Sequence, residues 1–80
     1  MYTVKNLQKT CGACPAQWEG VTVKGQEFYA RFRFGYFRAD IDNETIFGAS
    51  VGQDGFGGTM ETKRMRKLLH HLVTFITEEE

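Results

Sequence analysis

The sequence predicts an α+β domain in which an antiparallel β-meander of four or five strands is covered on one face by one C-terminal amphipathic helix. Three features support this fold class. Residues 26–34 alternate between apolar and polar side chains, turn-forming pairs separate the strand-like segments, and residues 59–77 repeat apolar side chains at helical spacing. Because the chain has 80 residues, residues 1–80 are expected to form a single domain.

The clearest predicted strand is residues 26–34, which separates an apolar set of side chains from a polar set. The apolar set is Phe28, Ala30, Phe32 and Phe34. A period of two places these side chains on one face of a half-buried antiparallel strand. Gly35 interrupts the pattern, and residues 36–41 continue it in the next strand.

The remaining segments before the helix are shorter and are separated by turns or loops. The other predicted strands are residues 1–7, 18–23 and 45–51. Turns are predicted at Lys24-Gly25 and Asp42-Asn43, and loops at residues 8–16 and 52–58. The second loop contains four glycines and precedes the helix, so it could hold a phosphate group or simply connect two elements.

The C-terminal helix is predicted from Thr59 to about Thr77, with Thr59 or Thr62 as its N-terminal cap. Its apolar side chains fall within one arc about 120° wide. They are Met65, Leu68, Leu69, Leu72, Phe75 and Ile76. This stripe is expected to pack on the phenylalanine face of the meander, because burying both apolar surfaces is the main favourable contribution available.

Composition excludes several classes of protein. Lys plus Arg and Asp plus Glu are 10 each, so the formal net charge is zero, which excludes a strongly basic nucleic-acid protein and an acidic DNA mimic. No apolar run approaches the roughly 18 residues of a membrane-spanning helix, and the first residues lack the apolar stretch of a signal peptide. The sequence therefore predicts a cytoplasmic protein without a membrane partner, and it leaves the oligomeric state open.

The residues that could carry chemistry form no convincing catalytic or metal site. Cys11 and Cys14 could be a redox dithiol, half of a zinc site, or two structural thiols in a turn stiffened by Pro15. We favour the structural interpretation, because the motif lacks the strand–helix context of a redox site and only His70 and His71 could complete a zinc site. The two histidines are predicted to be exposed on the helix. We therefore predict a protein that is not an enzyme and that holds no cofactor or metal.

The polar face of the predicted sheet carries an unusual set of aromatic and cationic side chains. They are Tyr29, Arg31, Arg33, Tyr36 and Arg38. Such a surface can stack on bases, bind phosphates or anchor a protein partner. The alternative is a solvated face with cross-strand pairs to Glu27 and Asp40. All three cations are arginines, whose planar, forked guanidinium groups suit specific contacts.

A second charged feature lies on the predicted helix. Its basic residues come first, and three glutamates, Glu78 to Glu80, come last. This order opposes the helix dipole, which favours acidic residues at the start and basic residues at the end. The candidate binding residues on the helix are Lys63, Arg64 and Lys67, which would form a basic patch for an acidic partner. The alternative is an ordinary solvated helix face.

Two segments resemble a group of small uncharacterised bacteriophage and bacterial proteins. The first is the run Thr10-Cys11-Gly12-Ala13-Cys14-Pro15-Ala16-Gln17-Trp18-Glu19. The second is the strand Tyr29-Ala30-Arg31-Phe32-Arg33-Phe34-Gly35-Tyr36-Phe37. The resemblance covers roughly residues 10–38 and implies a phage or prophage origin but no specific function. Small phage proteins that take over the host or block its defences commonly bind a larger target.

The sequence therefore predicts a non-enzymatic interaction protein that docks on a larger protein partner from host or phage. The alternative is a nucleic-acid-binding module that uses the same arginine and tyrosine side chains together with Lys63 and Lys67. A cysteine-containing metal or redox protein ranks below both.

Overall fold

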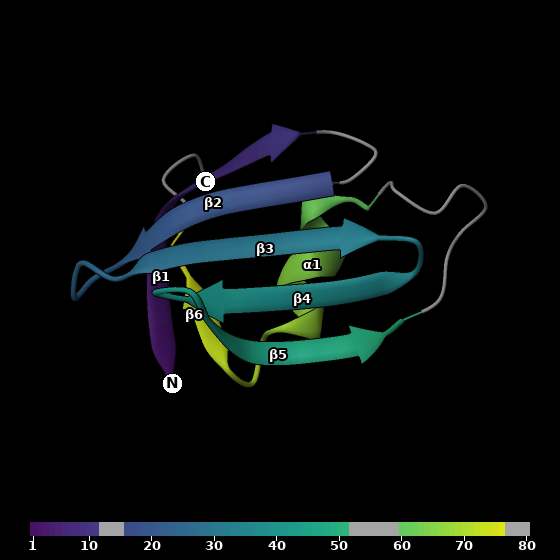
Figure 1. Ribbon diagram of the computed structural model, residues 1–80. Helices are drawn as coiled ribbons and strands as arrows, with labels where there is room; N and C mark the ends of the chain where they lie inside the picture. Colours follow the sequence, from purple (N-terminus) through teal and green to yellow (C-terminus); the bar gives the residue numbers. More distant parts are fainter. Residues whose placement is uncertain (12–15, 52–59, 77–80) are drawn as a thin grey trace.

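The protein, described by a computed structural model over residues 1–11, 16–51 and 60–76, contains a six-stranded sheet with one short helix behind it (Figure 1). The strands are β1 (Tyr2–Cys11), β2 (Ala16–Thr22), β3 (Glu27–Arg33), β4 (Tyr36–Ile41), β5 (Glu44–Ser50) and β6 (Val73–Phe75), and the helix is α1 (Thr62–Leu68). The strand order across the sheet is β5-β4-β3-β2-β1-β6. The first five strands pair antiparallel with their sequence neighbours, as predicted.

The two predicted hairpin turns form where their residues can adopt positive φ. Gly25 has a φ of 87°, and Asp42 and Asn43 have φ values of 50° and 68°. Positive φ at two successive residues is typical of a type I′ hairpin turn, for which Asp and Asn are well suited. The Asp42 carboxylate also accepts a hydrogen bond of 2.8 Å from the Glu27 backbone N–H. This contact ties the β4–β5 turn to the start of β3.

β1 is longer than predicted, and the loop expected over residues 8–16 is wrong at both of its ends. The strand continues to Cys11, and β2 already begins at Ala16. Asn6, with a φ of 56°, lies within an irregularity between Lys5 and Gln8 in the pairing with β2. β1 therefore bends, so that its first residues lie beside β6 and its last residues follow β2 (Figure 1).

The predicted helix of residues 59–77 is wrong in length. α1 has seven residues, and its C-terminal boundary at Leu69 is followed by turns and then by β6. The β-branched side chains of Val73 and Thr74 favour extended backbone. One edge of β1 is also free to pair with this segment. The hydrogen bond that the Ile76 N–H donates to the Val4 carbonyl, at 2.8 Å, belongs to this pairing. No described helix is long and apolar enough to cross a membrane.

β6 makes the sheet mixed rather than a pure antiparallel meander. It runs parallel to β1, with Tyr2 opposite Val73 and Val4 opposite Phe75. Parallel neighbours need a crossover connection, and α1 lies in the connection that leads from β5 to β6. The helix therefore covers one face of the sheet while returning the chain to the edge opposite β5.

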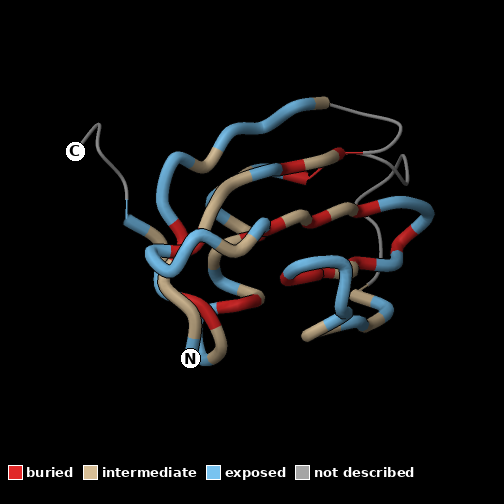
Figure 2. The backbone as a smooth tube through the Cα atoms, turned by 60° about the vertical axis from the view of Figure 1, so that its left-hand side comes forward, coloured by how far each residue is buried: buried red, intermediate tan, exposed pale blue. Residues whose placement is uncertain are grey.

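The core lies between α1 and the apolar face of the sheet, as the alternation predicts. Its largest side chains include Trp18, Phe28, Phe32, Phe37 and Met65, all fully buried. The buried positions recur along β2, β3 and β4 (Figure 2). Phe34 is an exception to the prediction. It adopts a φ of 52° in the β3–β4 turn, and its side chain is 77% exposed.

Trp18 connects the sheet to the start of α1. Its ring packs edge-on against Phe37, with the centroids 6.4 Å apart, and the Lys9 ammonium lies 5.4 Å from the Trp18 ring centroid. The Trp18 Nε1–H donates a 2.9 Å hydrogen bond to the Thr62 hydroxyl. Thr62 therefore does not cap α1. Glu61 occupies the N-cap position without a side-chain hydrogen bond, and Thr59 lies outside the described residues.

Replacing Thr62 with valine should leave the Trp18 Nε1–H buried without this acceptor. We expect Thr62→Val to lower the free energy of unfolding by about 1–3 kcal/mol, the usual cost of an unpaired buried donor. Urea denaturation followed by tryptophan fluorescence measures this loss. The control is Thr74→Val at an exposed position in β6, which should change stability by less than about 0.5 kcal/mol. Equal effects of the two substitutions would contradict the assignment.

Candidate functional site

The outer face of the sheet, which points away from α1, brings four of the predicted binding residues together. In the β3–β4 hairpin, Arg31 lies directly opposite Arg38, and Arg33 lies directly opposite Tyr36. These four side chains line a shallow hollow of about 120 Å³. We call this set the arginine cluster. Its members come from two adjacent strands. Alternation along each strand and the register between the strands place all four side chains on one face.

The Arg31–Arg38 pair places two like charges opposite each other on neighbouring strands, an arrangement that destabilises a sheet. The only ion pair recorded for the cluster among the described residues joins Arg38 Nε and an Asp40 carboxylate oxygen at 3.4 Å. It runs along β4, whereas the alternative of a solvated face predicted pairs across strands. The Arg38 side chain is 43% exposed, so water screens this pair and its contribution is small.

Two guanidinium donors in the cluster are shielded from solvent without a hydrogen-bond partner among the described residues. They are the Nε atoms of Arg31 and Arg38. The 3.4 Å contact from Arg38 to Asp40 lacks hydrogen-bond geometry, and Asp40 instead accepts a 3.0 Å hydrogen bond from the Thr45 hydroxyl. An unpaired buried donor costs about 1–3 kcal/mol. The cluster therefore combines uncompensated charge with unused hydrogen-bonding capacity.

Two aromatic side chains, Tyr36 within the cluster and Phe34 next to Arg33, make specific contacts. The Tyr36 ring lies over Gly48 on β5, where a Cβ would overlap the Tyr36 hydroxyl. Gly48 therefore makes room for the ring. Phe34 packs against Arg33, whose guanidinium lies 5.0 Å from the Phe34 ring centroid. Tyr36 is 48% exposed and Phe34 is more exposed still, so both present apolar surface next to the arginines.

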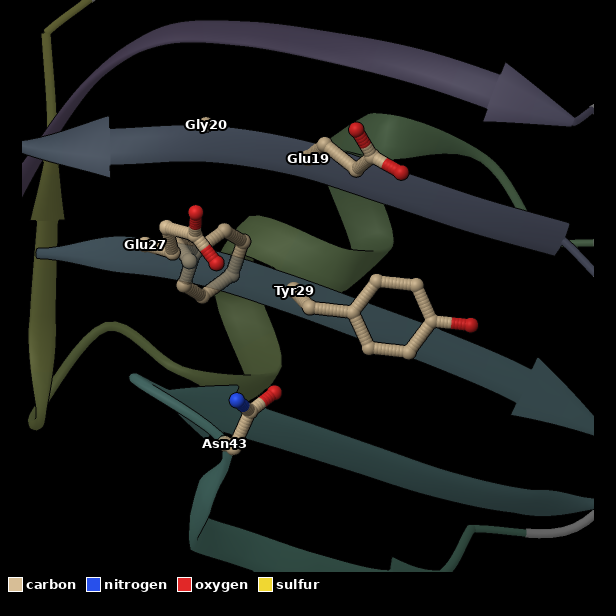
Figure 3. A pocket seen from close by; sticks show the side chains of 6 residues that line it. Glu19, Gly20, Glu27, Tyr29 and Asn43 are labelled. Carbon is tan, nitrogen blue, oxygen red and sulfur yellow. The ribbon is translucent and has the colours of Figure 1, made fainter.

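The other end of the same face is acidic. A second hollow, of about 360 Å³, is lined by Glu19, Gly20, Glu27, Phe28, Tyr29 and Asn43. Figure 3 shows Tyr29 beside Glu19 of β2, with its ring directed towards the C-terminal end of β3. Tyr29 lines the acidic hollow and does not line the hollow of the arginine cluster. Glu19 was not predicted as a site residue, although the alternation of residues 18–23 already places it on the face of the sheet opposite to that of the buried Trp18.

The predicted basic patch of the helix does not join the arginine cluster. Lys63, Arg64 and Lys67 lie on α1, which packs on the other face of the sheet (Figure 1). Arg64 donates a 3.1 Å hydrogen bond to the Val51 carbonyl. The predicted inversion of helix charges is confirmed only at the start of α1, where Lys63 and Arg64 lie and no acidic residue does. It is wrong at the end, because α1 ends early and Arg66 and Lys67 occupy its last turn, where the dipole favours cations. Residues 78–80 lie outside the described chain.

Among the described residues, Cys11 and the two histidines form no recognisable chemical site. Cys11 is half-buried at the end of β1, whereas Cys14 lies outside the described residues, as does the glycine-rich loop. His70 and His71 are exposed, as predicted, but they follow α1 instead of lying within it, and their rings meet edge to face at 4.8 Å. Over residues 1–11, 16–51 and 60–76, no three His, Cys, Asp or Glu side chains group as metal ligands.

Comparisons with known proteins return nothing similar: no protein-family model matches the chain, and neither does a curated protein or a solved structure. The resemblance to small phage and bacterial proteins therefore stays a prediction. Function must be argued from the geometry of the arginine cluster.

Replacing Arg31 should relieve the repulsion with Arg38 and remove an unpaired donor. We expect Arg31→Thr to raise the free energy of unfolding by a few tenths to about 1 kcal/mol. The gain should shrink in about 1 M NaCl, where charges are screened beyond roughly 3 Å. Urea denaturation at low and high salt measures both effects.

The matched control for this substitution is Arg33→Thr. Arg33 faces Tyr36 and not another cation, so its replacement should bring no gain in stability. A loss of stability in Arg31→Thr, or an equal gain in both variants, would contradict the inferred repulsion.

Proposed function

We propose that the protein is a non-enzymatic binding protein that docks on a larger protein partner through the arginine cluster. The observation that carries this proposal is the direct opposition of Arg31 and Arg38 on the outer face of the sheet. This arrangement lowers stability, and a domain of 80 residues has only a small margin of stability. A role in binding gives a physical reason for keeping it.

The composition of the cluster suits a protein interface. Arginine and tyrosine are enriched among residues that dominate binding energy, because they combine apolar area with directional donors. Arg31 and Arg38 have Nε–H groups that are shielded from solvent and lack partners in the part of the chain that the structure describes, and Tyr36 and Phe34 offer exposed aromatic surface. An acidic patch on the partner would pair with the guanidinium groups and exclude water from the aromatic rings.

A nucleic-acid-binding module is less well supported. That alternative needs a continuous basic groove along which the phosphate backbone can run. Lys63 and Lys67 lie on the far side of the sheet from the cluster, and Glu19 and Glu27 flank Tyr29 at the other end of the same face. A strand of nucleic acid that crossed the face would meet these carboxylates.

The cellular setting is part of the same proposal. The resemblance of residues 10–38 to small phage and bacterial proteins suggests a cytoplasmic protein of phage origin that interferes with a host target. A small binding protein can act in this way by occluding the surface of a larger one.

The proposal is tested by changing Arg31, Arg33 and Arg38 together to serine in a tagged protein. The variant should lose at least about 90% of a partner that the native protein captures from a bacterial lysate, because clustered anchor residues carry most of the binding energy. Capture is measured by quantitative mass spectrometry. Circular dichroism checks that the fold is retained.

The matched control changes Lys63 and Lys67 to serine on α1, which removes positive charge from the opposite side of the molecule. This control should capture the partner normally. Unchanged capture by the triple variant would contradict docking through the cluster. Loss of capture in the control alone would assign binding to the helix.

A further inference from the structure

We infer that the arginine cluster receives a phosphate monoester carried by a side chain of the protein partner. This inference rests on the proposed function and specifies the group that the cluster binds. The hollow of about 120 Å³ is lined by Arg31, Arg33, Tyr36 and Arg38, none of which is acidic. Arginine clusters of this kind recognise phosphate through forked, charge-assisted hydrogen bonds.

The charge of the hollow favours a dianion. Its three guanidinium groups carry three positive charges, and the 3.4 Å contact of Asp40 with Arg38 offsets one of them. About two positive charges remain for a ligand. A phosphate monoester carries about −1.5 to −2 at neutral pH, whereas a carboxylate carries one negative charge. The monoester therefore neutralises the cluster most completely.

The two opposed arginines can share such a ligand once their Nε–H groups, which are shielded from solvent, turn towards it. The Nε–H groups of Arg31 and Arg38 come from directly opposed positions on β3 and β4 and lack partners among the described residues. A phosphate group offers three oxygens, so one ligand can accept from both arginines at once. Binding would also replace the repulsion between the two cations with attraction to a shared anion.

The surroundings favour a phosphorylated side chain over a nucleic-acid backbone. Each phosphodiester of a nucleic acid carries one charge, and its neighbours along the strand would need further cations. The same face instead becomes acidic towards Glu19 and Glu27. Exposed Phe34 and Tyr36 adjoin the arginines and can pack on the residue that carries the phosphate. This combination fits an isolated phosphate beside apolar atoms, as in phosphotyrosine.

The experiment is a titration of the isotope-labelled full chain, followed by NMR through the Nε–H signals of Arg31 and Arg38. The probe is a short peptide of neutral residues with one phosphotyrosine. The matched peptides carry either tyrosine or sulfotyrosine, which has similar tetrahedral oxygens but a single negative charge. A short oligothymidylate tests the nucleic-acid alternative.

The phosphopeptide should shift both Nε–H signals and saturate, and the tyrosine peptide should leave them unchanged. The sulfotyrosine peptide should bind about tenfold more weakly, which corresponds to about 1.4 kcal/mol. Arg31→Gln and Arg38→Gln should each weaken phosphopeptide binding at least about tenfold. Lys67→Gln, on the opposite side of the molecule, should bind normally.

Equal binding of the phosphorylated and unphosphorylated peptides would overturn the inference, as would tighter binding of oligothymidylate. If no peptide binds but the triple serine variant still loses its protein partner, docking through the cluster stands and only the phosphate assignment is wrong. If the triple variant also keeps its partner, the proposed function fails as well.

Discussion

The register of the β3–β4 hairpin is the constraint on which the rest of the structure depends. It places Phe32 opposite Phe37 on the buried face and Arg31 opposite Arg38 on the outer face. Because side chains alternate, a slip of one residue would turn the phenylalanines to water and bury the arginines. Such a slip would expose several aromatic rings to water and bury unpaired charges. Its cost in free energy therefore specifies the register strongly. Core and candidate site are therefore two consequences of one pairing.

This pairing also explains how a small domain can tolerate an unfavourable surface. The apolar face buries Trp18, Phe28, Phe32 and Phe37 against α1, and such burial is the dominant favourable contribution to folding. The repulsion between Arg31 and Arg38 is smaller, because both lie on a solvated face. The outer face is then available for binding without loss of the fold. Its division into a basic and an acidic end gives a neutral protein a locally charged surface.

The helix illustrates where pattern and tertiary structure disagree. Met65 and Leu69 are buried at helical spacing, as predicted, but Val73 is also buried while the chain is extended. Over a few turns, an apolar repeat at helical spacing does not reveal where the helix gives way to a strand. The free edge of β1 and the β-branched side chains of Val73, Thr74 and Ile76 decide the outcome. The early end of α1 also moves Arg66 and Lys67 into its last turn, which removes the predicted charge inversion at that end of the helix.

Local sequence determined the features that depend on neighbouring residues: the alternation of β3 and β4, the positive-φ turns at Gly25 and Asp42-Asn43, and the separation of phenylalanines from arginines. Only the tertiary structure decided the features that depend on distant residues. These are the parallel β1–β6 pair, the grouping of Glu19 with Tyr29 and Asn43, and the separation of Lys63 and Lys67 from the arginine cluster. The physical reason is that periodicity assigns a side chain to a face, whereas contacts between distant segments determine what that face adjoins.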